Sequence, residues 1–190
     1  KSQIYGSVRN TNYQSGMAKD SEERNFEADL SALETILGYT FFNKVHLITA
    51  ITHRSYLNEH REATQDHNER LEFLGDAVLE LVVTDYLFRT YPEEPEGELT
   101  AIRAALVNTI SLAEASLQLG VNDYPLMSKG EARDTGRARP YILANVFEAF
   151  VGALYLDQGY DASKTFIAKH LFPKTDEIVE KRLWQDSKSR

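Results

Sequence analysis

Apolar side chains return every three or four residues along most of the chain, which is the spacing of one helix face. This pattern predicts two short helices, one over residues 26–37 and one over residues 45–51. The longest run covers residues 68–90, and a Tyr-Pro pair stops it. A second long run over residues 99–119 ends at Gly120, a residue typical of helix C-termini.

The second half of the chain continues the helical pattern after a break. Gly, Pro, Asn and Asp residues over residues 121–140 predict a long loop region. One helix is expected over about residues 142–157, and a last one from about residue 161 towards Trp184. No segment alternates apolar and polar residues as a strand does, and no repeat of roughly 20 to 50 residues occurs. The sequence therefore predicts an all-α, multi-helix bundle.

Composition narrows the class of protein. The 190 residues suffice for one domain with a single core. Residues 1–25 are expected to form a flexible tail, in which an expression-tag remnant before Met17 is one alternative. The absence of cysteine excludes disulfides, thiolate metal sites and cysteine nucleophiles. No apolar stretch reaches the roughly 20 residues of a membrane span, so we expect a cytoplasmic protein without a membrane partner.

Three acidic residues share one face of the longest predicted helix. Glu69, Glu72 and Asp76 are spaced by three and four positions, so their carboxylates repel one another and could be relieved by a cation. Gly75 costs about 1 kcal/mol in a helix interior, which is understandable where another backbone or a ligand comes close. The alternative is an ordinary solvated face of an amphipathic helix.

A second helix offers matching oxygen ligands. Asn145 and Glu148 share a face of the helix expected over residues 142–157. If the two faces meet, they form an all-oxygen site suited to Mg²⁺ from Glu72, Asp76, Asn145 and Glu148. The net charge of -8 argues by itself against a nucleic-acid partner, but cations bound at such a site would neutralise part of it.

The segment ERLEFLGDAV at residues 69–78 is similar to the signature of the ribonuclease III family, endonucleases that cut double-stranded RNA. Three further segments resemble the family in order and spacing, at residues 38–59, 95–107 and 142–160. The resemblance covers about residues 28–185. It implies an all-α ribonuclease III endonuclease domain over residues 26–185 that forms a two-fold homodimer. Residues 186–190 resemble the start of a linker to a double-stranded RNA-binding domain that is absent here.

The resemblance also implies roles for single residues. It assigns the catalytic acids as Glu69, Glu72, Asp76, Glu96 and Glu148. Of these, Glu72, Asp76 and Glu148 would bind Mg²⁺, for which Mn²⁺ could substitute. The family's usual aspartate is Asn145 here, which keeps a carbonyl oxygen ligand but loses a negative charge. A double-stranded RNA-binding or processing-scaffold relative with weak catalysis is therefore the alternative function.

The implied reaction is Mg²⁺-dependent hydrolysis of double-stranded RNA in RNA processing, which gives 5′-phosphate and 3′-hydroxyl ends with short 3′ overhangs. The metal ion would supply positive charge where the attacking and leaving oxygens of the anionic phosphodiester gain negative charge. Phe73 is expected at the dimer interface in a cavity of the second subunit, with a core phenylalanine as the alternative.

Basic and polar residues outside the acidic helices allow further predictions. His53 is interpreted as a hydrogen-bonded structural histidine with Ser55 and Tyr56 nearby, and a role in RNA contact or catalysis is the alternative. Arg103 is interpreted as an anchor for a carboxylate, with a phosphate as the alternative. A basic stretch before the second ligand helix could bind RNA phosphates, with a solvated turn as an equal alternative. Its members are Lys129, Arg133, Arg137 and Arg139.

Overall fold

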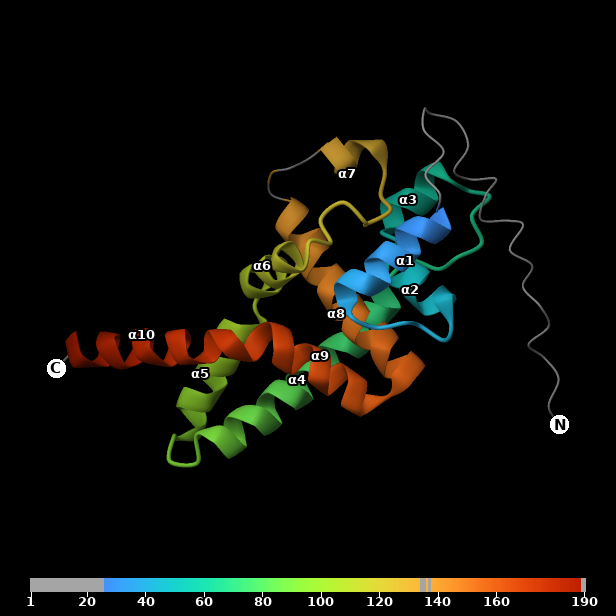
Figure 1. Ribbon diagram of the computed structural model, residues 1–190. Coiled ribbons are helices and arrows are strands. Elements are labelled where there is room, and N and C mark those ends of the chain that lie inside the picture. Colours follow the sequence, from blue (N-terminus) through green and yellow to red (C-terminus); the bar gives the residue numbers. More distant parts are fainter. Residues whose placement is uncertain (1–25, 134–135, 137, 189–190) are drawn as a thin grey trace.

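The computed structural model describes residues 26–133, 136 and 138–188 and shows a bundle of helices (Figure 1). The tail expected over residues 1–25 lies outside the described residues. Among the described residues, the only β-type pairing is one isolated parallel bridge between two loop segments. The prediction of an all-α fold is therefore confirmed.

Two long helices are accompanied by shorter ones. The long helices are α4 (Glu69–Thr90) and α8 (Ala138–Gln158). The others are α1 (Phe26–Leu37), α2 (Lys44–Ile51), α3 (Arg54–Glu59), α5 (Glu96–Val107), α6 (Thr109–Leu119), α7 (Lys129–Arg133), α9 (Tyr160–Leu171), the 3₁₀ helix η1 (Phe172–Lys174) and α10 (Thr175–Lys188). In Figure 1, α10 projects from the bundle and α5 lies beside the C-terminal half of α4.

The core surrounds α8. Phe147 and Phe150 of α8 are fully buried, and Phe166 of α9 is buried with them. Burying an apolar side chain of this size stabilises the fold by about 1.5–3 kcal/mol relative to leaving it in water. α8 packs against α2, α4, α6 and α9, which explains why its sequence is apolar on nearly all sides.

The run predicted as one helix over residues 99–119 is two helices. Asn108 separates α5 from α6, with extended backbone angles of φ -73° and ψ 161°. Its side chain accepts a hydrogen bond of 2.9 Å from the backbone N–H of Ser111. Because asparagine satisfies an otherwise unpaired N–H at a helix start, it favours a break at this position. The apolar spacing continues across the break and therefore does not indicate it.

The last predicted helix is also interrupted. α9 ends at Leu171, and the 3₁₀ turn η1 contains Pro173 before α10 begins at Thr175. Proline has no backbone N–H and its ring clashes with the preceding turn, so one continuous helix cannot pass through it. The expectation of a single helix from about residue 161 towards Trp184 is therefore wrong.

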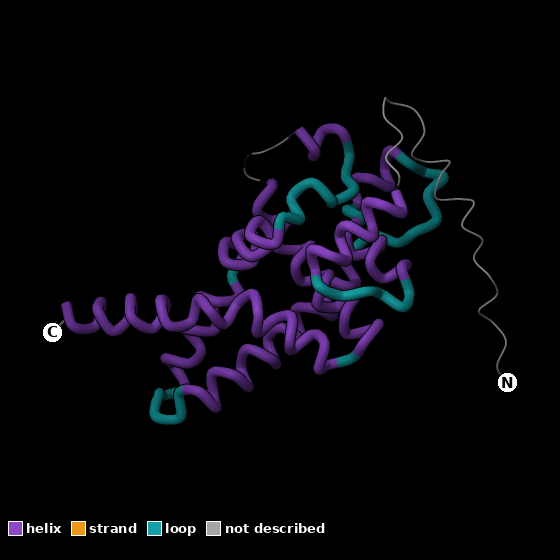
Figure 2. The backbone as a smooth tube through the Cα atoms, viewed as in Figure 1, coloured by secondary structure: helices purple, strands orange, loops and turns teal. Residues whose placement is uncertain are grey.

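The loop predicted over residues 121–140 is shorter than expected. It contains the short helix α7, and α8 already begins at Ala138. Pro140 fits the first turn of α8 because N–H groups there need no partner within the helix. The sequence pattern did not indicate α3 either, in which the ring of His53 caps the backbone N–H of Ser55. Figure 2 shows the loop between α6 and α7 running over the same end of the bundle as α3.

Candidate active site

Two glycines bring α4 and α8 into backbone contact. A Cβ atom on Gly75 would lie 1.8 Å from the carbonyl oxygen of Glu148. A Cβ atom on Gly152 would lie 2.3 Å from the carbonyl oxygen of Leu71. Neither position can carry a side chain unless the helices move apart. The close approach predicted for Gly75 is therefore confirmed.

This crossing gathers acidic side chains from both helices. Glu72 and Asp76 lie on either side of Gly75 on α4, and Glu148 faces them from α8. Burial, followed by the negative charges of Asp76 and Glu72, raises the pKa of Glu148 to about 8. Burial also raises the pKa of Glu72, as do the charges of Glu69 and Asp76. We call Glu72, Asp76 and Glu148 the acidic cluster.

The donor chemistry of the acidic cluster fits a hard divalent cation. Carboxylates supply only oxygen ligands, and a cation would counter the repulsion that raises the pKa of Glu148. Asn145 is half-buried on α8, one turn before Glu148, and its amide oxygen is a ligand of the same kind. As the side chains stand, the described residues contain no group of three or more His, Cys, Asp or Glu residues arranged to hold a metal ion. Metal binding therefore stays a prediction.

Glu69 lies at the edge of the acidic cluster. It is the first residue of α4, and its carboxylate is 3.3 Å from the guanidinium of Arg54 and 3.8 Å from Nδ1 of His67. After burial, the negative charge of Glu69 is the next cause that raises the pKa of Glu72. Side chains from α3 and from the loop before α4 therefore lie beside Glu69, a neighbourhood that the sequence pattern did not indicate.

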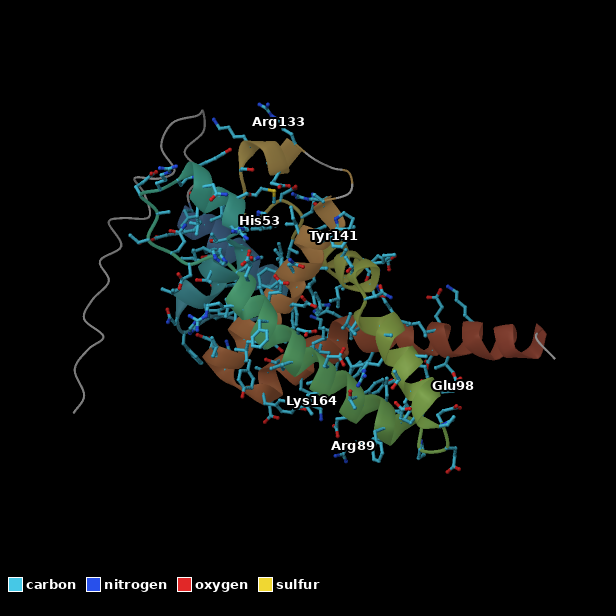
Figure 3. The ribbon with its side chains drawn as sticks, turned by 180° about the vertical axis from the view of Figure 1, so that it is seen from behind. His53, Arg89, Glu98, Arg133, Tyr141 and Lys164 are labelled. Carbon is cyan, nitrogen blue, oxygen red and sulfur yellow. The ribbon has the colours of Figure 1, made fainter. Side chains whose placement is uncertain are left out.

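Glu96 is not brought to the acidic cluster within one chain. It begins α5, where its carboxylate accepts a hydrogen bond of 2.8 Å from the hydroxyl of Thr100. Its α4 members, Glu72 and Asp76, lie near the start of that helix, whereas Glu96 follows the end of the helix, which has 22 residues and is about 33 Å long. In Figure 3, Glu98 of the same α5 turn lies far from His53, which precedes α3.

The structure places the members of the predicted basic stretch in different surroundings. Lys129 and Arg133 are exposed on α7, whereas Arg137 lies outside the described residues. The guanidinium of Arg139 donates to the side chain and backbone of Asn122 and lies 3.2 Å from the sulfur of Met127. Arg139 thus fastens the preceding loop to the start of α8.

Comparison with protein-family models matches residues 43–175 to the family described as Ribonuclease-III-like. The chain belongs to this family. The resemblance found in the sequence is therefore confirmed over most of the described residues of this ribonuclease-III-like protein.

Curated relatives from bacteria are similar to most of the chain. Ribonuclease 3 of Geobacillus sp. (strain WCH70) is 51% identical over 161 residues, which cover 84% of this chain and 65% of that protein. Ribonuclease 3 of Geobacillus kaustophilus (strain HTA426) is 53% identical over 150 residues, 79% of this chain and 61% of that protein. The ribonuclease-III-like chain thus spans less than two thirds of the length of these relatives.

A solved structure shares the fold. The nuclease domain of ribonuclease III from Campylobacter jejuni matches with a TM-score of 0.66 and 42% identity, covering 74% of this chain and 97% of that one. That structure concerns flexibility in a region involved in dimer formation.

None of the described helices of the ribonuclease-III-like chain is both long and apolar enough to cross a lipid bilayer.

Three predictions for single side chains can be compared with the ribonuclease-III-like fold. Phe73 is 80% exposed, so the alternative of a core phenylalanine is wrong. His53 is hydrogen-bonded to Ser55 as expected, with 2.7 Å between Nδ1 and Oγ. Arg103 anchors a carboxylate as expected, since its Nε lies 3.0 Å from Oε2 of Glu80.

Proposed function

We propose that this ribonuclease-III-like chain is a divalent-metal-dependent endonuclease that hydrolyses phosphodiester bonds in double-stranded RNA. The observation that carries the proposal is the acidic cluster, where burial and neighbouring carboxylates raise the pKa of Glu148 to about 8. Carboxylates held together against their repulsion are typical of functional sites rather than of stabilising contacts. Membership of the family supports the class of substrate.

Residues of both crossing helices would hold the metal ion, Mg²⁺ or, as a substitute, Mn²⁺. Glu72 and Asp76 would bind from α4, and Glu148 with the amide oxygen of Asn145 would bind from α8. When bound, the ion supplies positive charge that stabilises the negative charge developing on the phosphoryl oxygens and the leaving 3′ oxygen. The backbone contact at Gly75 fixes the spacing of the two helices, so the side chains that would bind the ion start from backbones at a set distance.

Basic side chains of α3 and α7 would contact the RNA backbone. α7 presents Lys129 and Arg133 on the surface, and Arg54 lies at the edge of the cluster next to Glu69. Phosphate contacts fix the position of RNA without reading its sequence, which suits a substrate recognised as a duplex. We expect products with 5′-phosphate and 3′-hydroxyl ends, and short 3′ overhangs where two subunits each cut one strand.

Incubation with a long RNA duplex in Mg²⁺, Mn²⁺ or chelator tests this function. We expect cleavage with either metal ion and none with chelator. Glu148→Gln keeps the side-chain volume and removes the charge, so it should abolish cleavage while duplex binding persists. Glu93→Gln is the matched control, because it removes an exposed carboxylate from the turn between α4 and α5 and should cut at the wild-type rate. Duplex binding by the wild type without any cleavage would contradict the proposal and favour the processing-scaffold alternative.

We also propose that the chain pairs with a second copy of itself through α4. Phe73, Leu81 and Phe88 are 80%, 58% and 70% exposed, and with the exposed Ala77 they follow one face of this helix. An apolar stripe along one helix can pair with its own copy about a two-fold axis, which buries it on both subunits. The related Campylobacter jejuni domain also has a region involved in dimer formation. Such a dimer carries two acidic clusters, one for each strand of a duplex.

A further inference from the structure

The backbone between α2 and α3 connects the start of α4 with the loop before α7. On one side, the carbonyl of Thr52 accepts a hydrogen bond of 2.9 Å from the N–H of Asn68, which precedes α4. On the other side, the carbonyl of Ile51 accepts one of 2.7 Å from Leu126. The carbonyl of Leu126 in turn accepts one of 2.9 Å from His53. The segment that begins the acid-bearing helix α4 and the loop that leads to α7 are therefore hydrogen-bonded to the same short stretch of chain.

Ser55 extends this connection through its side chain. The backbone N–H of Ser128 donates to Oγ of Ser55 over 3.0 Å, and Oγ lies 2.7 Å from Nδ1 of His53. The backbone N–H of Ser55 also donates to Nδ1, so this nitrogen is an acceptor and the Ser55 hydroxyl donates to it. Burial lowers the pKa of His53, which favours the neutral ring that this arrangement needs.

Two more contacts fix where α7 begins. Oε2 of Glu59 accepts a hydrogen bond of 3.1 Å from the backbone N–H of Lys129. Oγ of Ser128 accepts one of 3.2 Å from the backbone N–H of Glu131. α3 therefore sets the start of α7, and Arg133 is exposed at the other end of this short helix. In Figure 3, Arg133 lies on the same side of the molecule as His53.

We propose that Ser55, oriented by His53, is a positioning residue that holds α7 at a fixed place relative to the acidic cluster, so that α7 binds the RNA backbone while the scissile phosphate lies at the cluster. The inference rests on the proposed function. Ser55 acts through the backbone of Ser128 and touches no reacting group. Its contribution is therefore to substrate binding rather than to bond breaking.

Kinetics on an RNA duplex in Mg²⁺ test this role. Ser55→Ala removes the hydroxyl but keeps the backbone bond to His53, so KM should rise about fivefold to tenfold with kcat changed by less than about twofold. The slope of log affinity against log salt should become shallower by about 0.9 for each phosphate that α7 no longer neutralises. Ser55→Thr restores the hydroxyl and should restore KM. Ser111→Ala is the matched control, because it removes a hydroxyl bond to the carbonyl of Ala105 away from α7 and should leave KM unchanged.

Amide hydrogen exchange measures the anchoring without catalysis. Ser55→Ala should speed exchange over residues 126–133 and leave α4 protected. Glu59→Ala, at an exposed position, weakens the second anchor and should act in the same direction even if Ser55→Ala fails to fold.

Four results distinguish a failure of this inference from a failure of the proposed function. A wild-type KM in Ser55→Ala overturns the inference, and so does a fall in thermal stability and kcat at unchanged KM, which a merely structural role produces. Unchanged exchange over residues 126–133 in both variants also overturns it. A wild-type chain that cuts no duplex instead refutes the proposed function. In that case the exchange measurement alone tests whether Ser55 holds residues 126–133 in place.

Discussion

Replacing Gly75 by alanine tests whether backbone contact between α4 and α8 builds the acidic cluster. The new Cβ would lie 1.8 Å from the carbonyl oxygen of Glu148 and 2.9 Å from the backbone nitrogen of Gly152. Carbon–oxygen contacts between backbones are normally about 3.3 Å or longer, so the helices must separate by about 1.5 Å. Both obstructing atoms belong to the backbone, so no side-chain rotation can relieve the clash.

Two opposing effects set the change in stability. Alanine is favoured over glycine in a helix interior by about 1 kcal/mol, whereas overpacking a tight contact costs typically about 1–3 kcal/mol and more where backbone must move. We expect Gly75→Ala to lower the free energy of unfolding by about 1–3 kcal/mol. Activity should fall further, because a displacement of about 1 Å in a catalytic arrangement can lower the rate about 100-fold.

Urea denaturation, Mn²⁺ titration calorimetry and duplex cleavage measure these effects on the folded variant. Gly97→Ala is the matched control, because an added Cβ on this α5 residue meets nothing within 4 Å. That control should gain less than the roughly 0.5–1 kcal/mol typical of a mid-helix position, because Gly97 lies in the first turn of α5, and it should cut normally. If Gly75→Ala retains wild-type stability, Mn²⁺ affinity and cleavage, the helix contact does not position the cluster and the argument for the site fails.

The remaining predictions concern one metal ligand, the dimer and acid stability. Asn145→Asp adds a carboxylate and should lower the Mg²⁺ concentration for half-maximal cleavage; a higher requirement would refute its role as a ligand. Phe73→Ala should shift sedimentation towards the monomer with little loss of thermal stability, since the side chain is 80% exposed, whereas Ile110→Ala on α6 should not. Burial lowers the pKa of His170, whose Nε2 is buried without a hydrogen-bond partner among the described residues. The folded state thus binds this proton more weakly than the unfolded chain, so His170 lowers the free energy of unfolding as the pH falls below about 6.5. Glu148, whose pKa burial raises to about 8, contributes in the opposite direction over the same range. In urea titrations His170→Leu should therefore gain stability relative to the wild type between about pH 7.5 and pH 5.5, and an equal pH dependence in both proteins would contradict this.

Features that depend on a single helix could be predicted from the sequence. The shared face of Glu72 and Asp76 follows from helix geometry alone, and Gly75 stands out because glycine is unfavourable in a helix interior. The sequence also offered a partner helix over residues 142–157, and the structure supplies the contact between the two helices that this argument left conditional. Gly152 meets the backbone of Leu71 on the other side of the same contact, so the two glycines act together.

Features that depend on the path of the chain could not be predicted in this way. The resemblance assigns Glu96 to the same set of catalytic acids, yet the rest of α4 after Asp76 and a turn separate it from the acids of that helix in one chain. Arg139 belongs to a basic stretch in the sequence, but its guanidinium is directed to Asn122 and Met127. Residue type alone does not say which of several nearby acceptors a long side chain reaches.

The contacts that hold α7 in place show why some interactions cannot be recognised from a sequence. The pair of His53 and Ser55 is visible as a local spacing, but Ser128, which completes the connection, comes 73 positions after Ser55 and donates through its backbone. Every residue except proline has such an N–H, so the identity of the partner carries no signal. Only the acceptor side chain is specific, and Ser55 and Glu59 supply it here. Substitutions at these acceptors therefore change the position of a loop whose own sequence stays intact.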